Sequence, residues 1–302
     1  MAQVRVGAMD IEYEMTGDGQ PLLLIMGLGG QLTSWPPGVV DAFVHRGFRV
    51  ITFDNRDSGL SSKGTLAVPP RWRQLAATVV RRLARSEYVL ADMANDALGL
   101  LSALNIEGAH VVGISMGAMI AQSMAITSPE RVLSLTSIMS TTGNPKVGRM
   151  ALRLLRLLPR LARADEQHFV DNQVEIFRHI SGPAFDAIEG RAIIEADTAR
   201  SYCPDGTVRQ TMAIIASPDR TPQLRRLDIP TLVIHGLVDP LVQPSGGMAT
   251  TSAVPGARLV MYPDMGHDLP AARLNEIADL IAEHTARGNE HRARSTLQTS
   301  SV

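Results

Sequence analysis

Ser115 is the residue whose surroundings point most directly to chemistry. Gly113 and Gly117 flank it at the spacing G-x-S-x-G, within AHVVGISMGAMIAQSMAI at 109–126. The run before the serine is apolar and of strand length, and the run after it has the Met- and Ala-rich composition of a buried helix. At so sharp a turn the hydroxyl is exposed, and the helix N-terminus favours developing negative charge. The spacing predicts a nucleophile, because a serine that only capped the helix would need neither glycine.

A serine hydroxyl needs a general base, and His267 is the best placed of the eight histidines. It lies in the loop PDMGHDLP, after the expected strand 258–262. Ligands of α/β sheets gather at the carboxyl ends of the strands, the edge at which Ser115 emerges. His110 lies inside the strand before the serine, and His235, which ends another strand, is expected to pack or hydrogen-bond locally.

The residue expected to orient this base is Asp239. It follows the strand that ends at His235, in GLVDP, and therefore reaches the same edge of the sheet from a neighbouring strand. Asp264 and Asp268 are rivals within the histidine's own loop, where a partner would add little rigidity. The chain order Ser, Asp, His is the order that this type of serine turn favours.

A glycine-rich loop at 26–30, MGLGG, follows another apolar strand. Its glycines could free the backbone N–H of Leu28 to point at a bound oxyanion. An ordinary strand-to-helix turn or a phosphate loop is the alternative. A dinucleotide site is disfavoured, because the run fits neither G-x-G-x-x-G nor a loop ending in Gly-Lys-Ser/Thr.

The elements that must position these residues alternate between strand and helix patterns. Strands are expected at 4–6, 11–14, 22–25, 49–53, 110–114, 132–139, 230–235 and 258–262, and helices at 37–46, 88–104, after Met116 and at 271–286. The polar loop 54–61 is expected to be a structural turn. Asp92 and Asp96, four residues apart on a helical pattern, are expected to form a solvated face rather than a metal pair.

The alternation stops between 144 and 220, where helical patterns follow one another and indicate an inserted helical module. Its first pattern places arginines three or four residues apart opposite leucines, and these are Arg149, Arg153, Arg156, Arg160 and Arg163. A helix that packs its leucines inward is the favoured interpretation. Peripheral contact with a lipid surface through Arg149, Arg153 and Arg156 is the alternative.

Composition excludes several classes of protein. A net charge of -1 argues against a dedicated nucleic-acid binder, and the single cysteine, Cys203, excludes an internal disulfide and a cysteine-rich metal site. The N-terminal residues lack the apolar core of a secretory signal, so cytoplasmic residence is expected. The polar segment 289–302 is expected to be a disordered tail. The sequence carries no indication of oligomeric state.

Together, LLLIMGLGG, FDNRDSGLSS, AHVVGISMGAMIAQ, IHGLVDP and the His267 loop resemble the α/β-hydrolase fold. Within it they are similar to the carboxylesterases related to aclacinomycin methylesterase, and the resemblance covers about residues 3–286. It implies an α/β fold with a mostly parallel eight-stranded sheet flanked by helices. The core would comprise 1–143 and 221–288, with a helical cap, 144–220, inserted after strand six.

The resemblance also implies roles for five residues. Ser115 would be the nucleophile, His267 the base and Asp239 the orienting acid, while the N–H groups of Leu28 and Met116 would form the oxyanion hole. The chain departs from many relatives in having Met26-Gly27 where they have His-Gly. It also has a long basic segment at 63–91 that could add a second wall to the site.

These features predict a serine hydrolase that cleaves a small-molecule carboxylic ester and requires no metal or organic cofactor. A thioesterase or a cofactor-free perhydrolase would use the same groups. A ligand-binding homologue that turns over slowly is the alternative from a different class.

Overall fold

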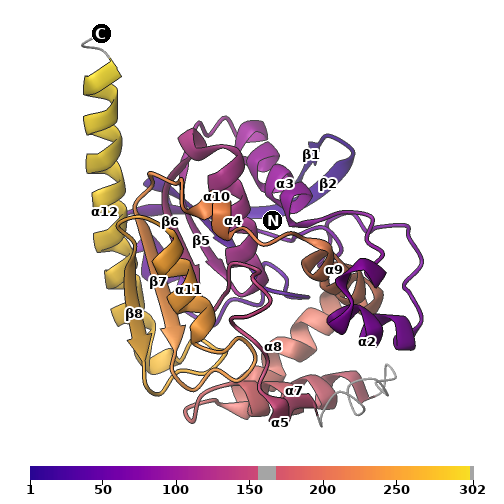
Figure 1. Ribbon diagram of the computed structural model, residues 1–302. Helices are drawn as coiled ribbons and strands as arrows, with labels where there is room; N and C mark the ends of the chain where they lie inside the picture. The colour runs from indigo at the N-terminus through magenta and orange to yellow at the C-terminus, as the bar shows by residue number, and fades with distance from the viewer. Residues whose placement is uncertain (156–167, 300–302) are drawn as a thin grey trace.

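The computed structural model describes residues 1–155 and 168–299. Its centre is an eight-stranded sheet in the order β1-β2-β4-β3-β5-β6-β7-β8 (Figure 1). The strands are β1 (Ala2–Val6), β2 (Met9–Thr16), β3 (Gln20–Ile25), β4 (Phe48–Phe53), β5 (Ala109–Ile114), β6 (Val132–Ile138), β7 (Thr231–Gly236) and β8 (Arg258–Tyr262). The strand β2 pairs antiparallel with β1 and β4, and all other pairs are parallel. The predicted mostly parallel sheet is confirmed.

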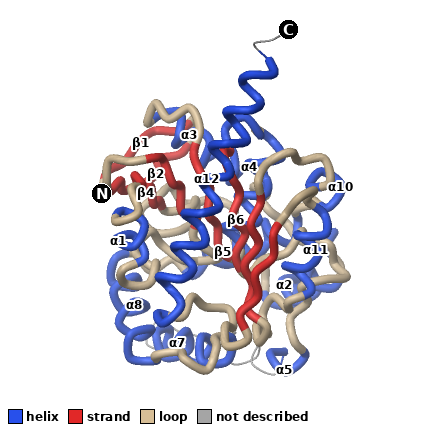
Figure 2. The backbone as a smooth tube through the Cα atoms, turned by 90° about the vertical axis from the view of Figure 1, so that its left-hand side faces the viewer, coloured by secondary structure: helices blue, strands red, loops and turns tan. Residues whose placement is uncertain are grey.

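Helices cover both faces of this sheet. Those that pack on the sheet are α1 (Val39–Val44), α3 (Leu90–Ala103), α4 (Met116–Thr127), α10 (Thr221–Leu224), α11 (Ser245–Ala253) and α12 (Leu274–Thr299). On one face α1 and α12 lie side by side, and on the other are α3, α4 and α11 (Figures 1 and 2). The inner strands are buried on both sides, which explains their nearly continuous apolar runs.

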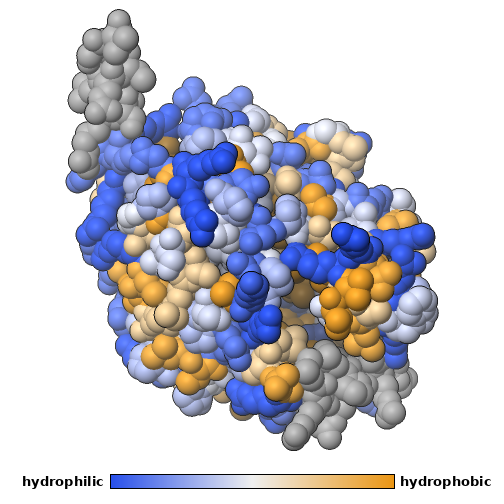
Figure 3. Space-filling model, in the orientation of Figure 1, coloured by the Kyte–Doolittle hydropathy of each residue, from blue (hydrophilic) through white to orange (hydrophobic). Residues whose placement is uncertain are grey.

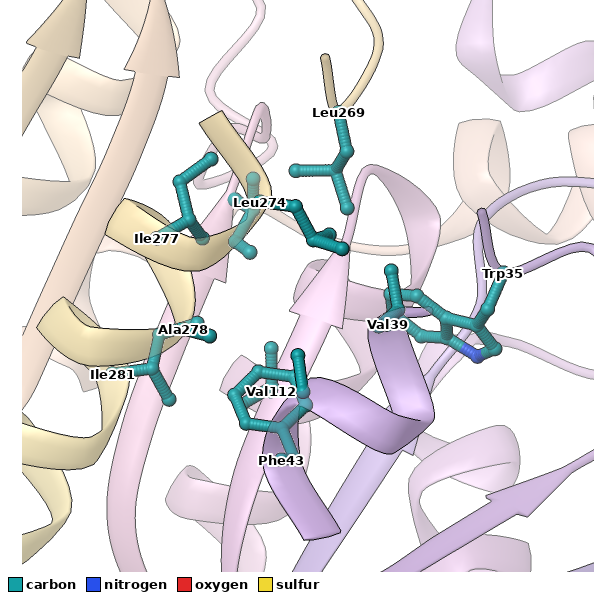
Figure 4. Close-up of a pocket in the computed structure, with 11 residues that line it drawn as sticks. Trp35, Val39, Phe43, Val112, Leu269, Leu274, Ile277, Ala278 and Ile281 are labelled. Carbon is teal, nitrogen blue, oxygen red and sulfur yellow. The ribbon is translucent and has the colours of Figure 1, made fainter. Parts of the chain in front are cut away.

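The interior on the α1 and α12 face is tightly packed. A cavity of about 10 Å³ lies between Trp35, Phe43, Leu274 and Ile277, with apolar side chains around it (Figure 4). Such a volume holds at most one water molecule. It is core, and a substrate must approach the molecule elsewhere.

The described helices between β6 and β7, apart from α10, gather at the carboxyl edge of the sheet, at the bottom and right of Figure 1. They are α5 (Leu152–Leu155), α7 (Phe169–Ile180), α8 (Ala187–Arg200) and α9 (Pro204–Ala216). We call these helices the cap. The cap therefore stands over the edge at which the sequence places its candidate residues.

The arginine pattern of the cap differs from the predicted stripe. Arg149 precedes α5, which begins only at Leu152, and its Nε donates to Pro145 O. Arg153 is exposed on α5. Arg156, Arg160 and Arg163 lie outside the described residues, so the lipid contact stays a prediction.

The basic segment 63–91 contains α2 (Arg71–Val79) and the short helix η1 (Arg81–Leu83), and α2 packs beside α9. The apolar residues Trp72, Leu75 and Val79 of α2 face outward, with exposed fractions of 67%, 55% and 84%. Figure 3 shows the corresponding hydrophobic area at the position of α2 in Figure 1.

The expectation that Asp92 and Asp96 form a solvated face is wrong for Asp96, which is only 6% exposed. The guanidinium of Arg56 donates to both of its carboxylate oxygens, at 2.5 and 2.7 Å. Asp92 instead accepts Val89 N–H at the start of α3. A helical spacing of four residues could not reveal that a loop 40 residues earlier supplies the counter-ion.

The predicted disordered tail, 289–302, is also wrong over its described part, because α12 continues to Thr299. Asn289 Nδ2 donates to Gln20 Oε1 at 2.9 Å, which ties the helix to the start of β3. A Cβ on Gly288 would lie 2.6 Å from Leu133 O, so the helix lies directly against β6. The tail lacks proline and has good helix formers, which allow the helix to extend.

Candidate active site

The joint between β5 and α4 is as sharp as the sequence predicts. Ser115 has a φ of 53°, in the left-handed region that is strained for a residue with a side chain. A Cβ on Gly113 would lie 2.3 Å from Gly117 O, and one on Gly117 would lie 2.0 Å from Ile25 O. Both flanking positions must therefore be glycine, and the backbone around the serine has no room to shift.

Three predicted residues come together at this joint. His267 Nε2 lies 2.9 Å from Ser115 Oγ, and His267 Nδ1 lies 2.8 Å from Asp239 Oδ2. A carboxylate only accepts, so Nδ1 carries the proton and the Nε2 lone pair faces the serine hydroxyl. This is the arrangement in which an imidazole can take a proton from serine.

The carboxylate of Asp239 is itself held by the loop after β7. Its Oδ1 accepts the N–H groups of Leu241 and Val242, both at 2.9 Å, and the residue is 3% exposed. These two bonds leave Oδ2 aimed at His267. Because the backbone holds one oxygen, the other has a defined direction without help from solvent.

The rival acids have other partners. Asp264 pairs with Arg273 at 3.1 Å. Asp268 Oδ1 accepts the N–H groups of Gly266 and Gly182, at 3.0 and 2.9 Å. Asp268 therefore joins the His267 loop to the cap residues after α7.

His235 packs locally, as expected from its place at the end of β7. Its Nε2–H donates to Val242 O at 2.8 Å and lies 3.6 Å from Asp239 Oδ2. Burial lowers the pKa of His235, so the ring stays neutral near neutral pH. It therefore adds no positive charge to compete for the carboxylate.

The predicted donors Leu28 and Met116 belong to two backbone segments next to the serine. A Cβ on Gly27 would lie 3.3 Å from Ser115 Cβ, so the oxyanion loop, residues 26–30, runs directly past the nucleophile. Met116 is the first residue of α4, where backbone N–H groups have no acceptor within the helix. Both backbone segments therefore adjoin Ser115, and the oxyanion role of their N–H groups stays a prediction.

Several residues that hold the site together carried no sequence signal. Asn55 Nδ2 donates to Met26 O at 3.0 Å, Gln210 Oε1 accepts Gly29 N–H at 2.8 Å, and Ser140 Oγ donates to Ser115 O at 2.8 Å. Asn55 belongs to the loop 54–61, which is structural as expected. The contacts of this loop are not all local, however, because Asp54 of the loop also binds Arg200 of the cap at 2.8 Å.

Within residues 1–155 and 168–299, no cluster of three or more His, Cys, Asp or Glu side chains is arranged to bind a metal ion. Over the same ranges, no helix has the length and apolarity to cross a membrane.

A family model described as alpha/beta hydrolase fold matches residues 20–271. The chain belongs to the α/β-hydrolase family. This α/β hydrolase is 31% identical over 289 residues to rhodomycin D methylesterase DnrP of Streptomyces peucetius, covering 88% of the chain and 90% of the relative. It is 27% identical to the 2-hydroxy-6-oxononadienedioate/2-hydroxy-6-oxononatrienedioate hydrolase of Burkholderia vietnamiensis, covering 85% and 84%. The expected resemblance to methylesterases of this family is confirmed.

Among solved structures, this α/β hydrolase is similar to the enol-lactonase from Burkholderia xenovorans LB400. The TM-score is 0.73 at 21% identity, with 94% of this chain and 100% of that chain covered. At that identity the likeness concerns the fold alone. Hydrolase chemistry therefore follows from the family and the relatives.

Proposed function

We propose that this protein is a serine hydrolase that cleaves carboxylic esters through an acyl-enzyme on Ser115. The observation that carries the proposal is the hydrogen-bonded series from Ser115 Oγ through His267 to Asp239, at 2.9 and 2.8 Å. A serine hydroxyl is a poor nucleophile until a base removes its proton. The series supplies that base in its reactive tautomer.

In the first half-reaction Ser115 Oγ attacks the ester carbonyl carbon while His267 Nε2 takes the hydroxyl proton. The carbonyl oxygen becomes an oxyanion that accepts from the N–H groups of Leu28 and Met116. Asp239 stabilises the imidazolium. The tetrahedral intermediate then collapses, and the leaving alkoxide takes the proton from His267 as it departs as an alcohol.

In the second half-reaction a water molecule replaces the alcohol. His267 takes a proton from this water, whose oxygen attacks the acyl carbon, and the same two N–H groups hold the new oxyanion. Collapse breaks the bond to Ser115 Oγ, which recovers its proton from the imidazolium. The carboxylic acid leaves, and the protein's own side chains complete the cycle without a cofactor.

Methyl esters of larger carboxylic acids are the first substrate class to examine, because the relative in Streptomyces peucetius is named a methylesterase. Thioester hydrolysis and peracid formation would use the same five groups and are the alternatives that a substrate panel must separate. Cytoplasmic residence remains part of this proposal.

The decisive experiment is labelling with a fluorophosphonate, followed by peptide mapping. We expect the label on Ser115, and Ser115→Ala should lose both the label and at least about 10⁴-fold in kcat/KM. Ser123→Ala is a matched control, because Ser123 is a buried serine of α4, the helix that follows Ser115, and its hydroxyl donates to Met119 O. Labelling that survives Ser115→Ala, or turnover of thioesters far above that of oxygen esters, would contradict the proposal.

A further inference from the structure

Gln210 lies in the middle of the cap helix α9, yet its side chain is fully buried against the core. Its Oε1 accepts the N–H of Gly29, and its Nε2 donates to Arg56 O, both at 2.8 Å. The amide thus bridges the oxyanion loop and the loop after β4. The residue belongs to the cap, but its partners belong to the catalytic edge of the sheet.

The two hydrogen bonds of Gln210 matter because the Leu28 N–H lies between backbone groups whose positions are fixed by hydrogen bonds. Gly27 O accepts Gly30 N–H at 3.2 Å, and Leu28 N–H belongs to the same planar peptide and points the opposite way. The next peptide, between Leu28 and Gly29, is held at its N–H by Gln210. The direction of the Leu28 N–H therefore depends on restraints on the peptides at both ends of Leu28.

Further restraints on this loop come both from the core and from α9. Asn55 Nδ2 donates to Met26 O at 3.0 Å, and Ser58 Oγ donates to Gly30 O at 2.6 Å. Gly29 has a φ of +71°, and a Cβ there would lie 2.8 Å from Thr207 Oγ1, so α9 lies directly on the loop. A loop with three glycines in five residues has many conformations open to it, and α9 is the element that excludes them from the cap side.

We propose that Gln210 is a positioning residue that aims the Leu28 N–H at the oxyanion, which makes the cap part of the catalytic machinery. This inference rests on the proposed serine-hydrolase function. Gln210 touches neither Ser115 nor the reacting carbonyl, and it acts through the Leu28–Gly29 peptide. Its effect belongs to the transition state, because the oxyanion exists only there and in the tetrahedral intermediates.

Gln210→Met tests the proposal by keeping the side-chain length and removing both hydrogen bonds. We expect kcat to fall about 10- to 100-fold with KM changed less than about threefold, since loss of an entire oxyanion-hole donor costs 10²- to 10³-fold. The Ki of a trifluoromethyl ketone, which forms a tetrahedral oxyanion on the serine, should rise by the same factor as kcat/KM falls. A role limited to stability would lower the unfolding temperature and leave this Ki unchanged.

Gln31→Met is the matched control. Gln31 is a glutamine that is also buried at the junction of cap and core, and its Nε2 donates to Asp197 O and Ser201 O at 2.6 and 3.1 Å. Its side chain does not bind the Leu28–Gly29 peptide. We expect kcat and the inhibitor Ki to stay within about twofold of wild type. An equal loss in both variants would overturn the specific role of Gln210.

Gln210→Glu provides a second variant with a signature of its own. A protonated carboxyl can accept from Gly29 N–H and donate to Arg56 O, whereas a carboxylate can only accept. Burial favours the protonated form. The charged groups beside this side chain are already paired, Arg56 with Asp96 and Arg209 with Asp57. We expect the ratio of its kcat to that of wild type to rise as pH falls, because protonation gives the carboxyl a donor for Arg56 O.

Three outcomes are separable. Gln210→Met that folds and keeps wild-type kcat and Ki overturns the proposal. So does a Gln210→Glu variant as impaired as Gln210→Met at every pH, because either form of its carboxyl still accepts from Gly29 N–H. If wild type fails to react with fluorophosphonate, the serine-hydrolase function fails instead. Amide hydrogen exchange then tests the contact by itself, since Gly29 N–H should exchange faster in Gln210→Met than in wild type, and equal rates would overturn it.

Discussion

Buried histidines occur at both ends of the central strands, and they differ in their partners. Near the start of β5, His110 Nδ1 meets Ser134 Oγ at 2.9 Å, and the neighbouring His284 Nε2 donates to Leu135 O at 3.2 Å. Burial lowers the pKa of each to about 4. At the carboxyl edge, His267 is also buried but lies between a carboxylate and a hydroxyl. The partners of an imidazole, rather than its burial, therefore equip it to act as a base.

Asp239→Asn tests this comparison most severely, because it removes the carboxylate and leaves the imidazole in place. An asparagine amide can favour the tautomer in which Nε2 carries the proton and cannot accept from serine. We expect kcat to fall about 10³- to 10⁴-fold with little change in KM, measured with an ester substrate. Asp264→Asn is the control, since its carboxylate binds Arg273, and it should stay within about twofold of wild type. Equal losses would mean that the wrong acid has been assigned.

His110→Asn tests the other end of the sheet. A base with a folded-state pKa of about 4 and an unfolded value near 6.5 binds fewer protons when folded, so stability is full above pH 6.5 and is lost as pH falls towards 4. Between pH 7 and 5 this loss amounts to about 2 kcal/mol for one histidine. Between pH 7 and pH 5, the free energy of unfolding of His110→Asn should therefore fall by about 2 kcal/mol less than that of wild type. Urea unfolding at the two pH values measures this difference. The exposed His45 provides a control as His45→Asn, and a wild-type pH response from His110→Asn would contradict the assignment.

Asp268→Ala should have the smallest effect, and it tests how far the His267 loop depends on the cap. Losing the acceptor for Gly266 and Gly182 N–H should cost about 1–2 kcal/mol of stability and up to about tenfold in kcat. Asp268→Asn keeps an acceptor oxygen and should remain close to wild type. Thermal unfolding and ester kinetics measure both effects, and matching losses in the two variants would point to charge rather than hydrogen bonding.

The sheet and its edge could be predicted because local rules govern them. Gly113 is dictated by its contact with Gly117, four residues further on, and Gly117 by its contact with Ile25 of the neighbouring strand β3. The positions of His267 and Asp239 follow from the strands that precede them. These signals survive in the sequence because changing the residue type would break the local geometry.

Other features depend on contacts between distant parts of the chain and could not be predicted. Gln210 meets Gly29 across 181 residues, and Asp96 meets Arg56 across 40. A glutamine on a helical pattern looks the same whether it faces water or a backbone amide. The extension of α12 depends in the same way on Asn289 reaching Gln20.

The cap's attachments also bear on how such proteins can diverge. The backbone N–H of His267 donates to Ile180 O at the end of α7, while α9 holds the oxyanion loop through Gln210. A cap transplanted from a relative would thus need its own acceptor for the histidine loop and its own side chain for Gly29. Changes of substrate during evolution are therefore easier by replacing cap side chains between these two attachments than by exchanging the whole module.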